Sequence, residues 1–205
     1  MKFIYIAINK CANTSFKSLL KEYGHILIPH NNIVGRDKET NLHFIKNSNV
    51  WSQYYKFTVV RNPVNRFLSS INFLIFKKYI ELDKDVIKKV VDVMFDTTQS
   101  YDFYYDEKHG IKRPDSKSCI KRVTLPITHN HYCLMKDNKL DIDYFIKIED
   151  LENKMEELCQ KIKINKKDMP HLNKSEYVVK DLSENYLETI KKYYELDAKI
   201  FNYNI

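Results

Sequence analysis

The sequence predicts an α/β fold in three layers, with a central, mostly parallel sheet flanked by helices. Three short apolar runs, at 3–8, 55–60 and 143–148, have the length and composition of strands that are covered on both faces. In the segments between them, apolar residues recur every three or four positions, which is the helical period. Strands that alternate with helices favour a parallel sheet, because a parallel strand reaches its neighbour through a crossover connection.

The first strand, FIYIAI at 3–8, is followed after a short loop by a helix that is expected to begin at Thr14. The spacing from there places four apolar side chains on one helix face: Phe16, Leu19, Leu20 and Tyr23. The apolar stretch GHILIP, at 24–29, is expected to hold a further short strand.

The second clear strand, YKFTVV at 55–60, ends at the tripeptide RNP. Proline suits the first turn of a helix, so Pro63 is expected to open the amphipathic helix that continues through 64–80. A further helix is expected at 85–95.

The second half of the chain begins with a polar, irregular stretch at 96–122, where a long loop is expected. The third strand leads into a helix at 149–162. A loop at 169–177 precedes the last helix, at 184–201, for which Ser183 has the side chain of a helix cap.

The composition predicts a single cytoplasmic domain over residues 1–205, without a transmembrane segment. With 43% hydrophobic residues the chain can form one sizeable core, and no repeat or linker divides it. No apolar run has the length of a membrane span, and the apolar N-terminus is too short for a signal peptide. The cysteines are scattered, as in a reduced protein: Cys11, Cys119, Cys133 and Cys159. His129 and His131 have no further ligand-like spacing beside them, so no bound metal is expected.

The net charge of +7 suits a nucleic acid, an anionic membrane face or an anionic small ligand as partner. The few arginines are more informative than the many lysines, because a guanidinium grips phosphate with two parallel hydrogen bonds. Two of these arginines fall within the six residues RNPVNR. All five are Arg36, Arg61, Arg66, Arg113 and Arg122.

Polar residues follow the first strand, where ligands bind in an open parallel sheet. The turn consists of Lys10, Cys11, Ala12, Asn13, Thr14 and Ser15. Backbone N–H groups at a helix start favour an anion there, and the lysine and the two hydroxyls would add to them. Asn13 tolerates left-handed geometry and Ala12 is small, so the turn does not need glycine. The alternative is an ordinary helix cap, formed by Asn13 or Thr14, with Lys10 in solvent.

The second strand end carries Arg61, with Arg66 and Ser69 on one face of the helix that follows. Arg61 and Ser69 are expected to converge on one phosphate. The alternative is a structural arginine that satisfies carbonyl groups, with Ser69 as a helix filler. Together the two strand ends indicate a ligand with two anionic ends, although the GxxxxGK[ST] signature of nucleoside triphosphate loops is missing.

These segments resemble the carbohydrate sulfotransferase family, which includes heparan and chondroitin sulfotransferases and many bacterial relatives. FIYIAINKCANTSF resembles the family's 5′-phosphosulfate loop, and KFTVVRNPVNRFLSSINFL resembles its 3′-phosphate motif. The resemblance extends to further segments: WSQYYKFTVVRNP, DYFIKIEDLE, MPHLNKSEY and YYELDAKIFNY. Two departures are the loop without glycine and the absence of an expected glutamine near HYCLM.

The resemblance implies a P-loop-like fold and the donor 3′-phosphoadenosine 5′-phosphosulfate (PAPS), with adenosine 3′,5′-bisphosphate (PAP) as product and no metal. It implies a sulfuryl transfer to a hydroxyl of an acceptor that is expected to be a carbohydrate. Lys10 would stabilise the leaving group, the turn at 11–15 would hold the 5′ end, and Arg61 and Ser69 would hold the 3′-phosphate. HLNKS would lie over the nucleotide through Asn173, Lys174 and Ser175.

The catalytic base is expected to be His43, because a histidine has a pKa near working pH and the resemblance places one at this position. The alternative for His43 is a cap of a helix at 42–48. Basic residues in or beside the 96–122 loop could meet an anionic glycan: Lys108, His109, Lys112, Arg113, Lys117, Lys121 and Arg122.

Two other functions remain compatible with the residues themselves. A P-loop nucleotide kinase would need magnesium and ATP. A basic RNA-binding module would use the aromatic residues, 13% of the chain, as stacking platforms. The aromatic residues mostly follow core periodicity, so no nucleic-acid partner is expected.

Overall fold

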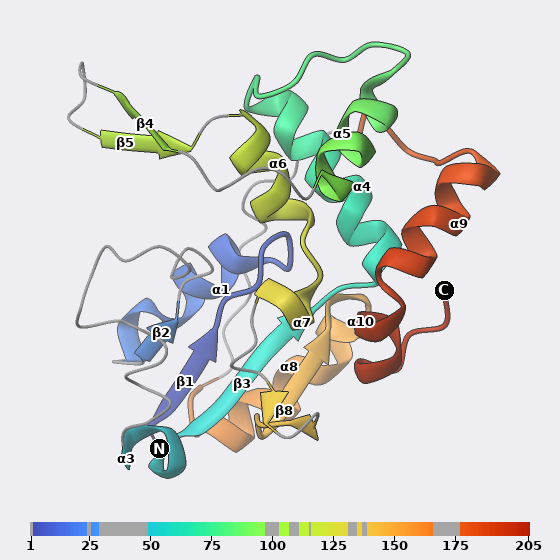
Figure 1. Cartoon of the computed structure of the whole chain (residues 1–205). Helices are drawn as coiled ribbons and strands as arrows, with labels where there is room; N and C mark the ends of the chain where they lie inside the picture. Colours follow the sequence, from blue (N-terminus) through green and yellow to red (C-terminus); the bar gives the residue numbers. More distant parts are fainter. Residues whose placement is uncertain are drawn as a thin grey trace.

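The protein is built on a parallel sheet of four strands in the order β2-β1-β3-β8, shown in a computed structural model (Figure 1). The strands are β1 (Phe3–Ile6), β2 (Ile26–Ile28), β3 (Tyr55–Val60) and β8 (Tyr144–Lys147). The structure describes residues 2–23, 26–28, 49–96, 103–106, 111–114, 116–130, 135–136, 139–165 and 177–205. The α/β prediction is confirmed, and so is the short strand expected within GHILIP.

Strands β1 and β3 form the centre of the sheet and are almost wholly buried. Their register pairs Phe3 with Tyr55 and Ile6 with Thr58, and the Thr58 hydroxyl donates to the Ile6 carbonyl over 2.7 Å. All pairings in the sheet are parallel, so the carboxyl ends of the strands open at one edge.

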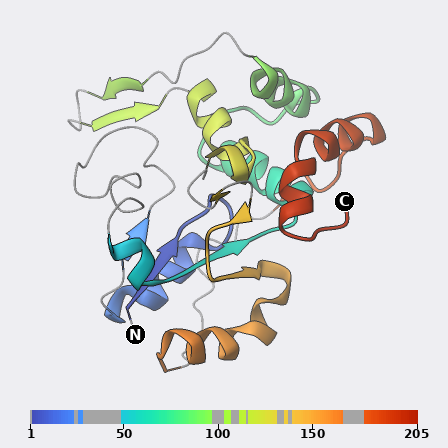
Figure 2. The ribbon, with the colours of Figure 1, turned by 60° about the horizontal axis from the view of Figure 1, so that its bottom comes forward.

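Helices surround the sheet and extend beyond that edge. They are α1 (Asn13–Leu20), α3 (Asn49–Gln53), α4 (Pro63–Phe76), α5 (Val86–Phe95), α6 (Ser116–Thr124), α7 (Ile127–Asn130), α8 (Leu151–Ile162), α9 (Glu184–Tyr193) and α10 (Glu195–Ile200), with 3₁₀ turns at Lys21–Tyr23 and Ile148–Asp150. Figure 2 shows α8 and the group α4, α5 and α6 on opposite sides of the sheet. None of the helices in the described ranges is long and apolar enough to cross a membrane.

The buried side chains form two clusters. One is the sheet core, in which Phe16 of α1 and Leu158 of α8 pack on β1 and β3. The other lies between α4, α5, α6 and α9 and includes Ile71, Val90 and Ile190. Because of the second cluster, the part of α4 that extends beyond the sheet is packed against other helices.

The prediction of a long loop at 96–122 is wrong in part. Strands β4 (Phe103–Asp106) and β5 (Ile111–Pro114) form an antiparallel hairpin, and α6 follows it. Helix α6 buries Cys119, Ile120 and Val123, a short apolar set that is hard to recognise in the sequence because serine, lysine and arginine residues make up most of the rest of the helix. The short hairpin of β6 (Met135–Lys136) and β7 (Lys139–Leu140) was also not expected.

The ends of other elements differ from the prediction by a few residues. Helix α4 ends at Phe76 rather than at residue 80, because Lys78 takes a left-handed conformation, with φ of 58°. The expected last helix is divided at Tyr194 into α9 and α10. Ser183 occupies the N-cap of α9, but its side chain makes no capping hydrogen bond.

A buried ionic cluster joins α4 to the C-terminal helices; we call it the joint and define it by Arg66, Thr128, Tyr194 and Asp197. Asp197 is fully buried and accepts from the Ile127 amide (2.6 Å), the Thr128 amide (3.0 Å) and the Thr128 hydroxyl (2.8 Å). Its carboxylate lies 3.9 Å from the Arg66 guanidinium. Asp197 thereby supplies hydrogen-bond acceptors to the first turn of α7 and a counterion to Arg66.

Arg66 reaches the end of α6 from within α4. Its guanidinium donates to the Leu125 carbonyl (2.7 Å) and the Val123 carbonyl (3.4 Å) and lies 5.1 Å from the centre of the Tyr194 ring. The Tyr194 hydroxyl in turn donates to the Thr124 carbonyl. Three separate helical segments therefore meet around one buried cation.

We predict that Asp197→Asn destabilises the fold by about 3–5 kcal/mol, because it leaves the buried Arg66 cation without its counterion. The matched control is Asp92→Asn, which removes one carboxylate from an exposed pair with Lys88 and should cost less than about 1 kcal/mol. Urea unfolding measures both. Equal losses in the two variants would show that the joint adds no more than a surface ion pair.

Candidate anion-binding site

The turn between β1 and α1 takes a conformation that suits anion binding. Lys10 and Ala12 both have left-handed backbones, with φ of 64° and 57°. The Cys11 amide donates to the Ile8 carbonyl (3.3 Å), and the helix begins with the Phe16 amide donating to the Ala12 carbonyl (3.0 Å). A left-handed residue beside a right-handed one turns successive N–H groups to the same side, which forms a concavity that binds anions.

The turn does without glycine, as expected, but not in the way expected. The expectation rested on the tolerance of Asn13 for left-handed geometry, whereas Asn13 is the first residue of α1, and Lys10 and Ala12 are left-handed instead. For residues with a Cβ atom this conformation costs about 1–2 kcal/mol each. Such strain persists where the surrounding structure holds it in place, often at functional sites.

Tyr5, which the sequence did not indicate, fixes the start of α1. Its buried hydroxyl donates to the Asn13 side-chain oxygen over 3.0 Å, and its ring stacks on Phe16 at 5.4 Å between centroids. Cys11 is fully buried beneath the turn, and burial raises the pKa of its thiol to about 12. Cys11 is thus a packing residue whose contribution to anion binding is limited to its backbone.

Lys10 lies along α4, with its ammonium nitrogen 4.3 Å from the centre of the Phe73 ring. Burial, and to a lesser extent the positive charges of Arg61 and Lys77, lower the pKa of Lys10 to about 8, against an opposing effect of Cys11. The alternative of a solvent-exposed Lys10 is therefore wrong, because the side chain is half-buried and faces other cations.

Arg61 follows β3, and its hydrogen-bond partners among the described residues are neutral. Its guanidinium donates to the Tyr177 hydroxyl (2.9 Å) and makes a long contact with the Lys10 carbonyl (3.5 Å). Neither Lys10 nor Arg61 forms an ion pair within the described part of the chain. Two cations from neighbouring strand ends thus lie close together without a carboxylate, which favours an anion between them.

Arg66 and Ser69, the other two residues singled out after the second strand, have different surroundings in the structure. Arg66 turns into the joint and satisfies carbonyl groups, so the structural interpretation is correct for this arginine. Ser69 is buried, with 5% of its surface exposed, and its hydroxyl makes no hydrogen bond within the described ranges. Its approach to a phosphate beside Arg61 stays a prediction.

Four predicted site residues lie outside the described residues: His43, Asn173, Lys174 and Ser175. Of the basic residues proposed to meet a glycan, Lys117 is exposed on α6, whereas Lys121 is buried and donates to the Asp96 carbonyl. The Arg122 carbonyl accepts from the Asn9 side chain (3.2 Å) and so ties α6 to the turn after β1.

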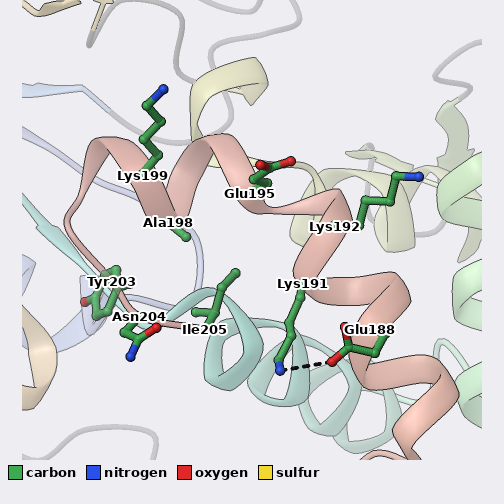
Figure 3. Close-up of a pocket in the computed structure, with 9 residues that line it drawn as sticks. All are labelled: Glu188, Lys191, Lys192, Glu195, Ala198, Lys199, Tyr203, Asn204 and Ile205. Atoms are coloured by element: carbon green, nitrogen blue, oxygen red, sulfur yellow. Dashed lines mark hydrogen bonds and ion pairs between the residues drawn. The ribbon is translucent and has the colours of Figure 1, made fainter.

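An open hollow of about 470 Å³ lies elsewhere, on the C-terminal helices (Figure 3). It is lined by Glu188, Lys191, Lys192, Glu195, Ala198, Lys199, Tyr203, Asn204 and Ile205. Lys191 is already paired with Glu188 at 3.0 Å, and none of the predicted site residues reaches the hollow. The strand-end turn, rather than this hollow, is the candidate site.

A parallel sheet with a cationic turn after its first strand defines the class of P-loop-like α/β proteins. The chain belongs to the sulfotransferase family, whose sequence model matches residues 1–204. It is thus a transferase of sulfur-containing groups, and the family implies PAPS as donor. Neither the curated proteins nor the solved structures give a significant match. Family membership decides against the kinase and the RNA-binding module.

We predict that Lys10→Met stabilises the protein at pH 7 in the absence of ligand, because it removes a poorly solvated cation beside Arg61. Below pH 8 the lysine is charged in both the folded and the unfolded chain. Between about pH 8 and 10.5 the folded protein releases this proton first, so the wild type gains stability as pH rises. The advantage of the variant should therefore shrink across this range.

Urea unfolding at pH 7, 8, 9 and 10 measures this difference. Lys78→Met is the matched control, because Lys78 is also left-handed, with φ of 58°, but exposed. A gain for Lys10→Met that is independent of pH would contradict the electrostatic account.

Proposed function

We propose that this sulfotransferase binds PAPS across the ends of β1 and β3 and transfers its sulfuryl group to a hydroxyl of a carbohydrate acceptor. The observation that carries the proposal is the pair of cations, Lys10 and Arg61, which interact electrostatically and form no ion pair among the described residues. A ligand with two anionic ends would place one end near each of these cations.

The residues fit such a donor. The pKa of Lys10 is lowered first by burial and then by the charge of Arg61, and an anion between the two cations would offset both effects. The turn at 11–15 is proposed to hold the 5′ end of the nucleotide through its backbone amides, apart from that of Cys11, which donates to Ile8, and through the hydroxyls of Thr14 and Ser15. Arg61 holds the 3′-phosphate together with Ser69, since a guanidinium binds phosphate through two hydrogen bonds. Asn173, Lys174 and Ser175 are proposed to cover the nucleotide.

Lys10 is assigned to the leaving group. When bound, the donor supplies a sulfuryl group whose bond to the 5′-phosphate oxygen breaks while a bond to the acceptor oxygen forms. Lys10 stabilises the negative charge that this phosphate oxygen gains, and it must be protonated to do so. Because anion binding favours charged lysine, a donor at this site raises the pKa of Lys10 and draws a proton from solution. The turn and Arg61 supply the positive charge without a metal.

His43 is proposed to accept the proton that the acceptor hydroxyl loses. A histidine with an ordinary pKa of about 6.5 is half-neutral near working pH and is well suited as a general base. A carboxylate or His109 is the next candidate. The carbohydrate class of the acceptor is supported by the family resemblance of the motifs and by the net charge of +7, which suits anionic glycans. Transfer of labelled sulfate to a panel of glycans, with a phenol and a steroid alcohol as controls, tests the class.

We predict that PAP, measured in EDTA, raises the melting temperature clearly more than ADP does, because only PAP has a phosphate at the 3′ position for Arg61. Arg61→Gln should weaken PAP binding about 10- to 100-fold, equivalent to about 1.5–3 kcal/mol for a hydrogen bond to a charged group, and should leave ADP unchanged. Lys180→Gln, at an exposed position, controls for the lost charge. Equal stabilisation of the wild type by PAP and ADP would exclude the 3′-phosphate assignment.

We predict that Lys10→Met loses far more turnover than PAP affinity, and that His43→Ala retains PAP affinity and loses turnover. The lysine acts on charge that develops in the transition state, and its loss should lower kcat about 100- to 1,000-fold. Loss of the base should lower kcat about 100-fold or more and remove the acidic limb of the pH–rate profile. Single-turnover rates with saturating acceptor, beside PAP titrations, separate the two effects. Loss of donor affinity with an unchanged rate would contradict the catalytic role proposed for that residue.

A further inference from the structure

Asn72 of α4 holds the segment that carries Tyr177 in a fixed position. Its side chain is 2% exposed and makes four hydrogen bonds. The amide nitrogen donates to the Leu68 carbonyl and to the Val179 carbonyl, both at 2.8 Å. The amide oxygen accepts from the Val178 amide (2.8 Å) and the Val179 amide (3.0 Å). All donors and acceptors of the carboxamide are thus used, so the irregular stretch 177–179 is held at one position along α4.

Tyr177 sits at the start of this anchored stretch and meets Arg61. The Tyr177 hydroxyl accepts from the Arg61 guanidinium at 2.9 Å, and the centre of that guanidinium lies 6.0 Å from the centre of the tyrosine ring. The other contact of the guanidinium, to the Lys10 carbonyl, is long at 3.5 Å. Tyr177 therefore provides the main restraint on the direction of the Arg61 side chain within the described residues.

The chemical nature of this partner matters. A carboxylate at the same place would orient Arg61 but would also neutralise it and compete with a bound phosphate. A phenol orients the guanidinium and leaves its full charge for the ligand. An arginine that is already oriented loses less side-chain entropy when it binds.

We propose that Tyr177 is a positioning residue that directs Arg61 toward the 3′-phosphate, and so contributes to selectivity for a nucleotide with a phosphate at that position. Asn72 is the structural element that fixes Tyr177. The inference rests on the proposed function, because it takes Arg61 as the group that binds the 3′-phosphate.

The test uses Tyr177→Phe, which keeps the ring and removes only the hydroxyl. Isothermal titration calorimetry gives the Kd of PAP and of ADP for the wild type and the variant. PAP should bind about three- to tenfold more weakly to the variant, since one long side chain must be ordered on binding, and ADP should bind unchanged. Tyr23→Phe is the matched control, because it removes the same atom from a tyrosine outside the site.

A double-mutant cycle separates positioning from direct contact. In the Arg61→Gln background the effect of Tyr177→Phe on PAP should disappear, because no guanidinium remains to be oriented. An equal effect in both backgrounds would show that the hydroxyl acts independently of Arg61 and would overturn the proposal. An unchanged Kd of PAP in Tyr177→Phe, or an equal loss for ADP, would also overturn it.

The same titrations tell this inference apart from the proposed function. If the wild type fails to distinguish PAP from ADP, the 3′-phosphate site itself is wrong. If the wild type distinguishes them and Tyr177→Phe does so equally well, the site stands and only the role of Tyr177 is rejected.

Discussion

The buried pair of Arg66 and Asp197 determines how the helices are arranged around the sheet. Taking two charges out of water is costly, and the cost is offset only where the remaining hydrogen bonds are also made. Asp197 meets this requirement through the first turn of α7, and Arg66 meets much of it through the carbonyls at the end of α6. The contact therefore fixes α4, α6, α7 and α10 in one arrangement, and α4 in turn carries Phe73 and Asn72 to the site.

The residues of the candidate site are held in backbone conformations and surroundings that are unfavourable for each of them alone. Two residues with Cβ atoms are held in left-handed conformations, and Lys10 is kept half-buried near Arg61, which lowers its pKa. Each of these features weakens the unliganded fold, and the proposed anion would offset the repulsion between the two cations. The residues around the site, Tyr5 beneath α1 and Tyr177 beside Arg61, hold the strained groups without neutralising them.

The sequence indicated the features that leave a local signature. Continuous apolar runs predicted the central strands, because burial on both faces excludes polar residues, and polar groups at the strand ends predicted the turn and Arg61. Arg66 could not be told from Arg61, since its role depends on Asp197, which lies far along the chain. The roles of Asn72 and Tyr177 could not be predicted from the sequence, because each depends on a hydrogen-bond partner in another segment of the chain. Helix α6 was missed because it has few apolar residues among its serine, lysine and arginine residues.

The position of Asp197 has a consequence for synthesis. The ribosome makes the chain from its N-terminus, and Asp197 follows its partner Ile127 by 70 residues. Until Asp197 has been synthesised, helix α4 can form, but Arg66 lacks the counterion with which it is buried. The backbone amides in the first turn of α7 also lack their hydrogen-bond acceptor. The sheet core can therefore collapse early, whereas the helical layer above it closes only after α10 has been made. A nascent chain stalled between these points would expose the apolar face of α4 and become a substrate for chaperones.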